Sequence, residues 1–203
     1  LGGVGANGGG KGTLLRVLAA RLAPDEGRVE IGETVRVGFF TQEGPELDLS
    51  QRVIDFIRST AERIETPEGT VSASQMLERF LFPAALQYTE IARLSGGERR
   101  RLQLLHVLMQ SPNVLFLDEP TNDLDVETVT ILEDYLETFP GAVVAVSHDR
   151  YFMDKVVSHL FAFEEDGTLR QYPGGSSDYL ARRPAAPAAA KEAQPRQSRE
   201  RTR

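Results

Sequence analysis

The sequence predicts an α/β domain built on a largely parallel sheet. Short apolar runs alternate with segments of helical periodicity along most of the 203 residues. A glycine-rich loop stands between an expected strand end at Val4 and a helix that begins at Lys11. Two carboxylates, Asp118 and Glu119, directly follow the apolar run 114–117. Both features fit a parallel sheet, because ligands bind at the carboxyl ends of its strands.

The composition predicts one globular domain and a tail. A hydrophobic content of 40% is enough for one sizeable core, which we place at 1–180, with the tail at 181–203. No apolar run approaches the ~20 residues of a membrane span, so we expect a soluble chain without membrane insertion. The absence of cysteine excludes disulfides and thiolate metal sites and allows a cytoplasmic location. Since Leu1 falls inside an expected strand and is not Met, we expect an N-terminally truncated fragment.

The charge is unevenly distributed along the chain. The net charge is −7, but residues 181–203 alone carry +5, which leaves −12 on the rest. An acidic body with a basic tail is an arrangement known from proteins that act near RNA or DNA. A solvated, disordered tail rich in Ala, Pro and Arg explains the same composition equally well, and both interpretations stay open.

The expected elements follow in order from their periodicity. Apolar runs predict strands at 28–31, 35–41, 114–117, 142–147 and 159–163, and the Asp166-Gly167 pair predicts a hairpin from the last of these into 169–172. Helical periodicity is found at 11–21, 51–64, 73–80, 97–109, 127–138 and 149–157.

Residues 46–93 differ from the rest of the domain. They lack strand-like runs, and two short amphipathic helices flank the turn Thr66-Pro67-Glu68-Gly69. We therefore expect a helical insert between Gln42 and Leu94.

The loop before the first helix has the composition of a phosphate-binding loop. It reads Gly5-Ala6-Asn7-Gly8-Gly9-Gly10-Lys11. Its glycines allow successive backbone N–H groups to turn around a phosphate chain, and the lysine reaches the outer phosphates. A flexible glycine linker is the alternative, but the strand before the loop and the amphipathic helix after it favour phosphate binding.

One position departs from this pattern. The residue after Lys11 is expected to be Ser or Thr, whose hydroxyl binds Mg²⁺, but here it is Gly12. Thr13 lies one helical step further on, about 100° around the helix axis, and contacts an inner phosphate more naturally.

Asp118 and Glu119 are the candidate metal and catalytic carboxylates. Asp118 suits Mg²⁺ bound through water, and Glu119 suits a general base acting on the attacking water. In isolation, two acids before Pro120 are also compatible with a helix cap or an exposed turn.

His148 and Gln42 each follow another expected strand. His148 comes directly after 142–147, so it is expected at the same sheet edge, where it can hydrogen-bond a γ-phosphate or the attacking water. A passive position in the first turn of a helix is the alternative. Gln42 can reach Mg²⁺ or water beside the insert, although a single glutamine is a weak signal.

Residues 94–98 read Leu-Ser-Gly-Gly-Glu and predict a helix start. Ser95 and Glu98 form a capping box, and Gly96 and Gly97 leave backbone N–H groups open to an anion. A well-capped helix without any ligand explains the same residues. However, the helix start at Lys11 already provides one phosphate site. The simplest explanation for a second one, at residues 94–98, is that it binds a nucleotide held by another domain.

The motifs in this order resemble an ATP-binding cassette (ABC) nucleotide-binding domain, a P-loop NTPase, over roughly residues 1–180. The family's order is Walker A, Q-loop, signature, Walker B, D-loop and H-switch. Residues 118–125, Asp-Glu-Pro-Thr-Asn-Asp-Leu-Asp, are similar to the ABC-F subfamily, as are residues 147–152. The charged C-terminal extension is similar to that after the second cassette of Uup-like members.

This resemblance implies a function and roles for the residues. Residues 5–13 would bind ATP, Asp118 and Gln42 would organise Mg²⁺, Glu119 would be the base and His148 the switch. The signature residues, Ser95 to Glu98, would contact ATP held by a partner cassette. Asp125 would lie at the seam between the two cassettes, and closure around two ATP molecules would be coupled to hydrolysis.

The resemblance also implies partners and alternatives. ABC-F members are soluble tandem-cassette ATPases that act on ribosomes, and the Uup-like branch is linked to nucleic acid. An ATPase subunit of an ABC transporter is the first alternative. A hydrolysis-impaired, ATP-gated binding module is the second, because Gly12 puts Mg²⁺ binding in doubt. The chain also begins after the point where the family's adenine-stacking aromatic residue is expected.

Overall fold

The predicted parallel sheet is present at the centre of the molecule. The computed structural model describes residues 1–4, 10–163 and 169–174. Six strands pair in the order β2-β5-β6-β1-β7-β8, and all neighbouring pairs are parallel except β7 with β8. The strands are β1 (Gly2–Val4), β2 (Val37–Phe40), β5 (Val114–Asp118), β6 (Ala142–Val146), β7 (His159–Phe163) and β8 (Leu169–Pro173).

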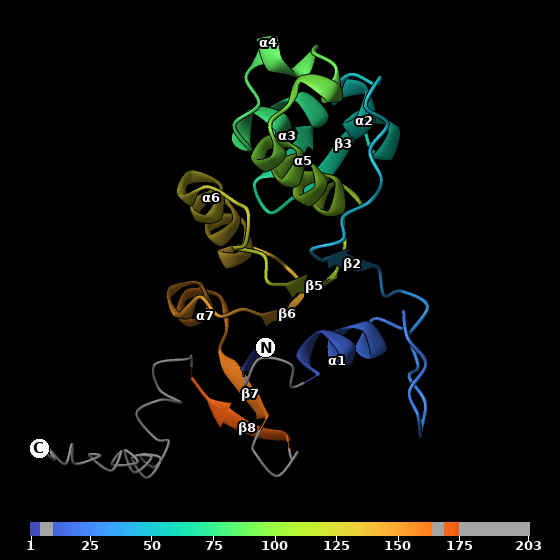
Figure 1. Cartoon of the computed structure of the whole chain (residues 1–203), viewed down its shortest axis with the longest axis vertical. Helices are drawn as coiled ribbons and strands as arrows, with labels where there is room; N and C mark the ends of the chain where they lie inside the picture. The colour runs from blue at the N-terminus through green and yellow to red at the C-terminus, as the bar shows by residue number, and fades with distance from the viewer. Residues whose placement is uncertain (5–9, 164–168, 175–203) are drawn as a thin grey trace, which may run out of the picture.

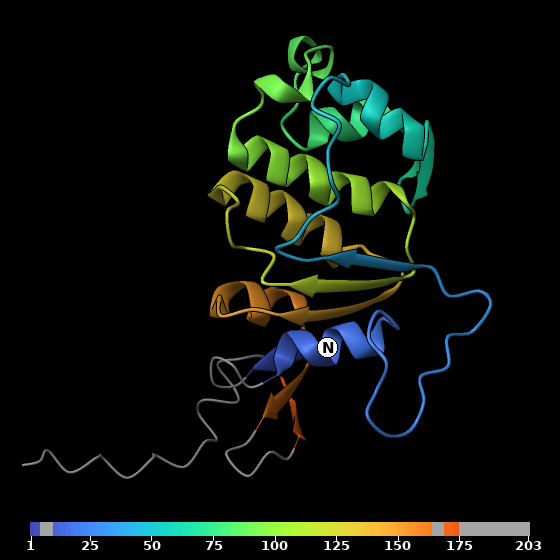
Figure 2. The same cartoon turned by 45° about the vertical axis from the view of Figure 1, so that its right-hand side comes forward.

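Helices cover both faces of this sheet (Figures 1 and 2). On one face α1 (Lys11–Leu18) packs Leu15 on Phe39 and Phe116, whose ring centroids are 5.9 Å apart. Alternation along the strands turns Phe40 and Leu117 to the other face. There the core includes residues of α5 (Gly96–Met109), α6 (Val126–Glu137) and α7 (Arg150–Val156).

The segment 46–93 lies beyond one end of the sheet, packed on α5 (Figure 1). It contains α2 (Val53–Thr60), β3 (Arg63–Thr66), β4 (Gly69–Ser72), α3 (Ala73–Arg79), α4 (Ala84–Gln87) and the 3₁₀ turn η1 (Ile91–Arg93). Fully buried Ile57, Met76, Phe80 and Leu102 belong to one continuous core that joins α2 and α3 to α5. The segment therefore contains more helix than strand and is tied to α5 by apolar packing.

The expectation that 46–93 lacks strands is wrong. Residues 51–64 do not form one helix, because Ala61 turns to an extended conformation with φ −158° and ends α2. Arg63 to Thr66 then pair antiparallel with Gly69 to Ser72. The turn between these strands needs a glycine, since Gly69 has φ +117°.

Two further boundaries differ from the sequence prediction. No strand forms at 28–31, where no described strand lies beside the segment to pair with its backbone. The helix expected at 11–21 ends at Leu18, because Ala20 adopts a left-handed conformation with φ +54°. The hairpin turn at 166–167 and the basic tail at 181–203 lie outside the described residues.

Candidate functional site

The carboxyl ends of β5 and β6 bring the predicted polar residues together. Asp118 ends β5 and lies opposite Val146, the last residue of β6. The backbone N–H of Glu119 donates to the Val146 carbonyl at 2.8 Å. Strand pairing therefore places Asp118 and Glu119 beside Ser147 and His148 at one sheet edge, where α/β folds bind their ligands.

Glu119 and His148 contact each other directly. The backbone N–H of His148 donates to Glu119 Oε2 at 3.1 Å, and His148 Nε2 lies 3.3 Å from Glu119 Oε1. The Glu119 side chain is only 13% exposed, whereas that of His148 is 58% exposed. Glu119 also has φ +48°, a strained conformation for a residue other than glycine. The backbone thus holds a nearly buried carboxylate against a histidine that remains open to solvent.

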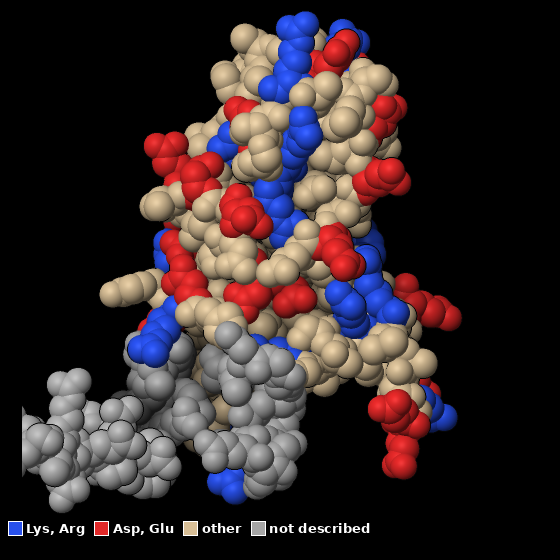
Figure 3. Space-filling view, viewed as in Figure 1, with Lys and Arg blue, Asp and Glu red and all other residues tan. Residues whose placement is uncertain are grey.

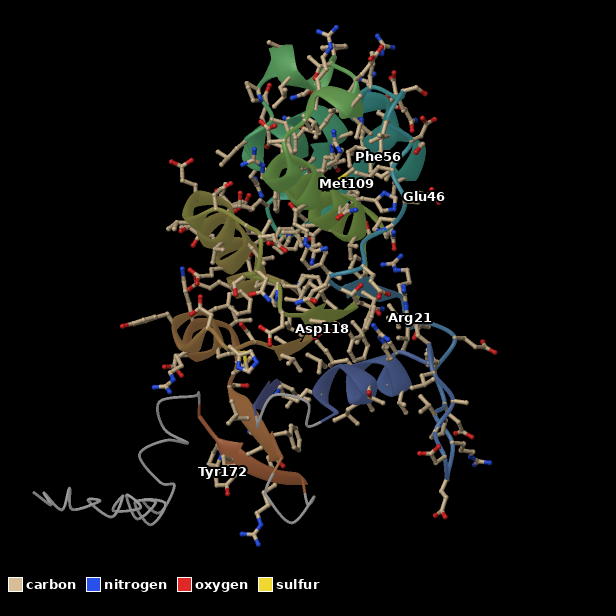
Figure 4. The ribbon with its side chains drawn as sticks, viewed as in Figure 1. Arg21, Glu46, Phe56, Met109, Asp118 and Tyr172 are labelled. Atoms are coloured by element: carbon tan, nitrogen blue, oxygen red, sulfur yellow. The ribbon has the colours of Figure 1, made fainter. Side chains whose placement is uncertain are left out.

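Asp118 faces the first turn of α1. A Cβ atom added to Gly12 would lie 3.1 Å from Asp118 Oδ2. Burial raises the pKa of Asp118, and the charges of Arg16 and Lys11 oppose that increase. Figure 4 shows Asp118 at the level where β5 approaches α1. The carboxylate is therefore half-buried between the sheet and a helix start that bears a lysine.

The end of the predicted phosphate loop is described, but residues 5–9 are not. Gly10 precedes α1 with φ +77°, a left-handed conformation that favours glycine, and its carbonyl accepts the first helical bond from Leu14 at 2.8 Å. Lys11 is 8% exposed, while Thr13 is exposed on α1. The N-terminus of α1 and a nearly buried lysine thus lie beside Asp118, an arrangement suited to anions.

The site around Asp118 offers few protein ligands for a metal ion, which fits Mg²⁺ better than a metal that is coordinated by protein groups alone. Within residues 1–4, 10–163 and 169–174, no group of three or more His, Asp or Glu side chains could hold a metal ion. Mg²⁺ usually keeps several waters and binds one or two carboxylates together with substrate phosphates. Asp118 can supply the carboxylate, but Gly12, which faces it, offers no hydroxyl.

Gln42 lies at the same edge of the sheet. Phe40, the last residue of β2, pairs with Leu117, and Gln42 follows two residues later, beyond the paired part of the strand. Its side chain is exposed, and its backbone carbonyl accepts a hydrogen bond from Arg100 Nη1 at 3.4 Å. The structure therefore places the Gln42 backbone at the sheet edge where β5 ends in Asp118, and a role for its side chain at the carboxylates stays a prediction.

The capping box at the start of α5 is formed. Glu98 Oε2 accepts from the Ser95 backbone N–H at 2.7 Å, and Ser95 Oγ accepts from the Glu98 N–H at 3.2 Å. Ser95 and Gly96 are exposed. Figure 3 shows a band of basic side chains over the insert and α5, all of them arginine in this part of the sequence, which favours the approach of an anion to this helix start.

Packing within the chain does not require a glycine at position 96. Apart from the adjacent residues and the backbone of its own helix, no described atom lies within 4 Å of the place where a Gly96 Cβ would stand. At Gly97 the nearest such atom is the Asp123 carbonyl oxygen at 3.8 Å. A helical glycine costs about 1 kcal/mol relative to alanine. The space above these two residues is therefore open to a molecule outside the described chain.

Asp125 has a structural role in the described chain. It caps α6, where its carboxylate accepts from the Thr128 N–H at 2.7 Å and from Arg101 Nη1 at 3.1 Å. The Thr128 backbone hydrogen bond is the main cause that lowers the pKa of Asp125, with smaller contributions from the Thr128 hydroxyl and Arg101. Its side chain is still 51% exposed, so one edge of the carboxylate faces outward.

Sequence reasoning missed two arginines of α5. Arg100 and Arg101 are 6% and 7% exposed, and their guanidinium groups lie over the rings of Phe40 and Phe82. Helical spacing was the available signal, because each precedes a core leucine, Leu104 or Leu105, by four residues. Burying two cations on the apolar face of a helix is costly, so we infer that these arginines have a role beyond solubility.

Comparison with known proteins gives the family. A family model described as "ABC transporter" matches residues 1–122, more than half of the chain. The chain therefore belongs to this family of ATP-binding cassettes, whose members are ATPases.

Curated relatives narrow the class of cassette. The chain is 53% identical over 97% of its length to the uncharacterized ABC transporter ATP-binding protein YfmR of Bacillus subtilis (strain 168). It is 39% identical to the energy-dependent translational throttle protein EttA of Haemophilus influenzae over 87% of its length, and 39% identical to the ATP-binding protein Uup of Escherichia coli (strain K12) over 86%. It spans about a third of each relative, 33%, 32% and 28% respectively. EttA and Uup are ABC-F proteins, so the ABC-F prediction is confirmed.

Solved structures confirm the fold. A complex of the archaeal ribosomal stalk protein aP1 with the ribosome recycling factor aABCE1 matches with a TM-score of 0.70 and 25% identity, over 89% of this chain and 36% of that one. An ATP-binding subunit of an ABC transporter matches with a TM-score of 0.68 and 15% identity, over 85% and 77% of the two chains, and shows the fold alone. No helix of the described part of the chain is long and apolar enough to cross a membrane.

Proposed function

We propose that this chain is an ABC-F-type cassette that binds and hydrolyses ATP, and that hydrolysis is coupled to its closure on a second cassette. The proposal depends above all on the Glu119–His148 pair, which lies at the sheet edge beside Asp118 and the start of α1. Lys11 and the N-terminus of α1 would bind the outer phosphates of ATP. Asp118, with Gln42, would hold Mg²⁺, which when bound supplies positive charge against the phosphates.

The two remaining residues would act on the attacking water. Glu119 is nearly buried and points to His148, so its carboxylate is fixed where it can accept a proton from that water. His148 contacts Glu119 from the solvent side, where it can orient the water or hydrogen-bond the γ-phosphate. The strained backbone at Glu119 supports this assignment, since such strain is commonly retained at functional sites.

The position of the signature residues supports a second cassette as partner. Lys11 lies on α1 against one face of the sheet, whereas Ser95 and Gly96 begin α5, which packs on the other face. The start of α1 and the start of α5 would therefore bind two different nucleotides rather than the same one. The open space above Gly96 is the room that a partner's ATP would need, and Asp125 would face the seam with its outer edge.

A role on ribosomes is the favoured cellular setting. One relative is named an energy-dependent translational throttle protein, and one structural neighbour is a ribosome recycling factor. Because the chain spans only about a third of its curated relatives, the activity and partners of a whole protein are part of this proposal. The basic residues at 181–203 would add a contact to RNA, with DNA as the alternative.

Replacing Glu119 by Gln tests the proposed chemistry. We expect ATP turnover to fall by about a hundredfold or more, because the amide cannot accept the proton. The affinity for ATP should stay within about twofold, since Glu119 does not bind the nucleotide directly. Steady-state hydrolysis and binding of a fluorescent ATP analogue measure the two effects, with Asp134→Asn, an exposed acid on α6, as the matched control. Undiminished turnover in Glu119→Gln would assign the base to another residue.

The same variant tests the ribosomal part of the proposal. A cassette that binds ATP without hydrolysing it should accumulate on ribosomes and sediment with them when ATP is present. If it binds ATP but never sediments with ribosomes, the translational role is wrong while the ATPase assignment stands. A transporter motor would give that result.

Gly12 favours a second candidate function, an ATP-gated binding module that hydrolyses poorly. Position 12 faces Asp118, and glycine supplies no hydroxyl there, so Mg²⁺ would have one protein ligand fewer. Under this alternative the natural chain binds ATP and changes its affinity for ribosomes, but shows little Mg²⁺-dependent turnover. Normal hydrolysis by the Gly12 protein would exclude it.

A further inference from the structure

The side chain of Arg100 spans the space between α5 and the end of β2. Its guanidinium lies 3.9 Å from the centre of the Phe40 ring, and its Nη1 donates to the Gln42 carbonyl at 3.4 Å. The residue is 6% exposed and projects from the second turn of α5, one turn after Gly96. Through this one buried side chain, α5, the helix that starts at the signature residues, is linked to the loop that begins at Gln42.

Stability does not explain a cation at this position. The Nε and Nη2 atoms of Arg100 are buried and have no hydrogen-bond partner in the described part of the chain. No carboxylate of the described residues forms an ion pair with it, and Asp123 acts on it only as a nearby charge. Burial accordingly lowers the pKa of Arg100. A methionine would fill the same space over Phe40 at lower cost, because apolar replacements of buried ions are often neutral or stabilising.

The two ends of this contact belong to two different nucleotide sites in the proposed function. Gln42 follows β2, the strand that pairs with β5 and its terminal Asp118, and would serve the ATP held by this chain. Ser95 to Gly97 would serve the ATP of the partner cassette. The Gln42 contact is made through a backbone carbonyl, so Arg100 can fix where the Gln42 side chain stands without competing for its amide. The neighbouring Arg101 makes the corresponding link from α5 to Asp125.

We propose that Arg100 is a positioning residue that couples the Gln42 loop to the start of α5, so that the state of one nucleotide site is passed to the other. This inference rests on the proposed ATPase function. The planar guanidinium stacks on Phe40 while it donates to Gln42, a combination that neither lysine nor methionine reproduces. Movement of the Gln42 loop would therefore shift α5 as one unit with it.

Amide hydrogen exchange on the nucleotide-free protein tests the physical link. Arg100→Met should increase exchange at residues 42–44 by about threefold or more, because their anchor is lost while the core packing remains. Arg79→Met removes a cation that pairs with Glu68 away from this site and should leave 42–44 unchanged. Arg100→Lys should give a smaller increase, and it provides the test if the methionine variant does not fold. Exchange at 42–44 that stays within twofold in the Arg100 variants would overturn the inference, whether or not the protein hydrolyses ATP.

Turnover in two backgrounds tests the functional consequence. If Arg100 acts through Gln42, Arg100→Met should lower kcat about tenfold with KM for ATP within about twofold, and should cost less than about twofold when Gln42 is already Ala. Equal losses in both backgrounds would mean that Arg100 acts independently of Gln42 and would overturn the inference. A natural-sequence protein without any ATP turnover would instead contradict the proposed function, and the exchange measurement would still decide the link.

Discussion

At residue scale, position 12 determines how well the candidate metal site can work. Gly12 faces Asp118 so closely that an added Cβ would lie 3.1 Å from the carboxylate oxygen. A serine there needs a shift of a few tenths of an ångström and then places a hydroxyl beside Asp118. The motif alone indicates this missing hydroxyl, and the structure adds that Thr13, which carries the next hydroxyl along α1, is exposed.

Gly12→Ser should therefore strengthen Mg²⁺-dependent hydrolysis. We expect the Mg²⁺ concentration for half-maximal turnover to fall about tenfold, equivalent to ~1.4 kcal/mol. Gly12→Ala is the control, because it adds the same Cβ without a metal ligand and should leave the midpoint unchanged or raised. Mg²⁺ titrations of ATP turnover measure all three proteins. Equal midpoints for the serine variant and the natural chain would show that the site does not lack this ligand.

At the scale of elements, the start of α5 combines a helix cap with an anion site, and substitutions can separate the two. Aspartate caps a helix about as well as serine, but adds negative charge where an anion is expected. Ser95→Asp should keep the free energy of unfolding within about 0.5 kcal/mol while it lowers ATP turnover by about tenfold or more. Ser95→Asn is the uncharged control that caps equally well. If the aspartate variant keeps full turnover, α5 is merely a capped helix.

The packing of α5 on α2 predicts a pH dependence of stability. His106 accepts or donates a hydrogen bond with Thr60 at 2.8 Å and stacks on Phe56 at 4.8 Å between centroids, and burial lowers its pKa. A histidine with a depressed pKa in the folded state takes up protons more readily when unfolded. Its contribution to stability is therefore present at neutral pH and is lost as pH falls below the unfolded value of about 6.5.

Replacing His106 by Phe should flatten this dependence. The aromatic contact with Phe56 is kept, while the titrating group is removed. Denaturant unfolding between pH 7.5 and 5, a range of roughly one unit above and more than one below the reference pKa, compares the slopes. Identical slopes for the two proteins would place the titration elsewhere.

Local sequence determined most elements but not those that depend on distant partners. The strands β5 and β6 and the start of α5 could be predicted because apolar runs and a capping box are local signals. The helix predicted over 51–64 includes the first two residues of β3, and only the pairing of this strand with β4 decides otherwise. At the site, the motifs predicted which loops meet, but the link from Arg100 to Gln42 depends on the packing of α5 on β2.

At the scale of the whole molecule, two half-sites on opposite faces of one sheet predict that neither is sufficient alone. Lys11 belongs to the α1 face and Gly96 to the α5 face. In the proposed function, a complete site would therefore take Lys11 from one cassette and the signature from another. Lys11→Ala removes the phosphate cation, and Gly96→Asp fills the open space with a negative charge. Each variant chain should be inactive by itself.

Mixing these two variants tests the composite site directly. In a mixed pair, the intact Lys11 of one chain meets the intact signature of the other, which restores one of two sites. If pairing is random, half of the pairs are mixed, so turnover should recover to roughly a quarter of that of the unaltered chain. The recovery should vanish on dilution, which separates it from residual activity of either variant. Full activity of Gly96→Asp alone, or no recovery on mixing at concentrations where the unaltered chain is active, would contradict a site shared between two copies of this cassette.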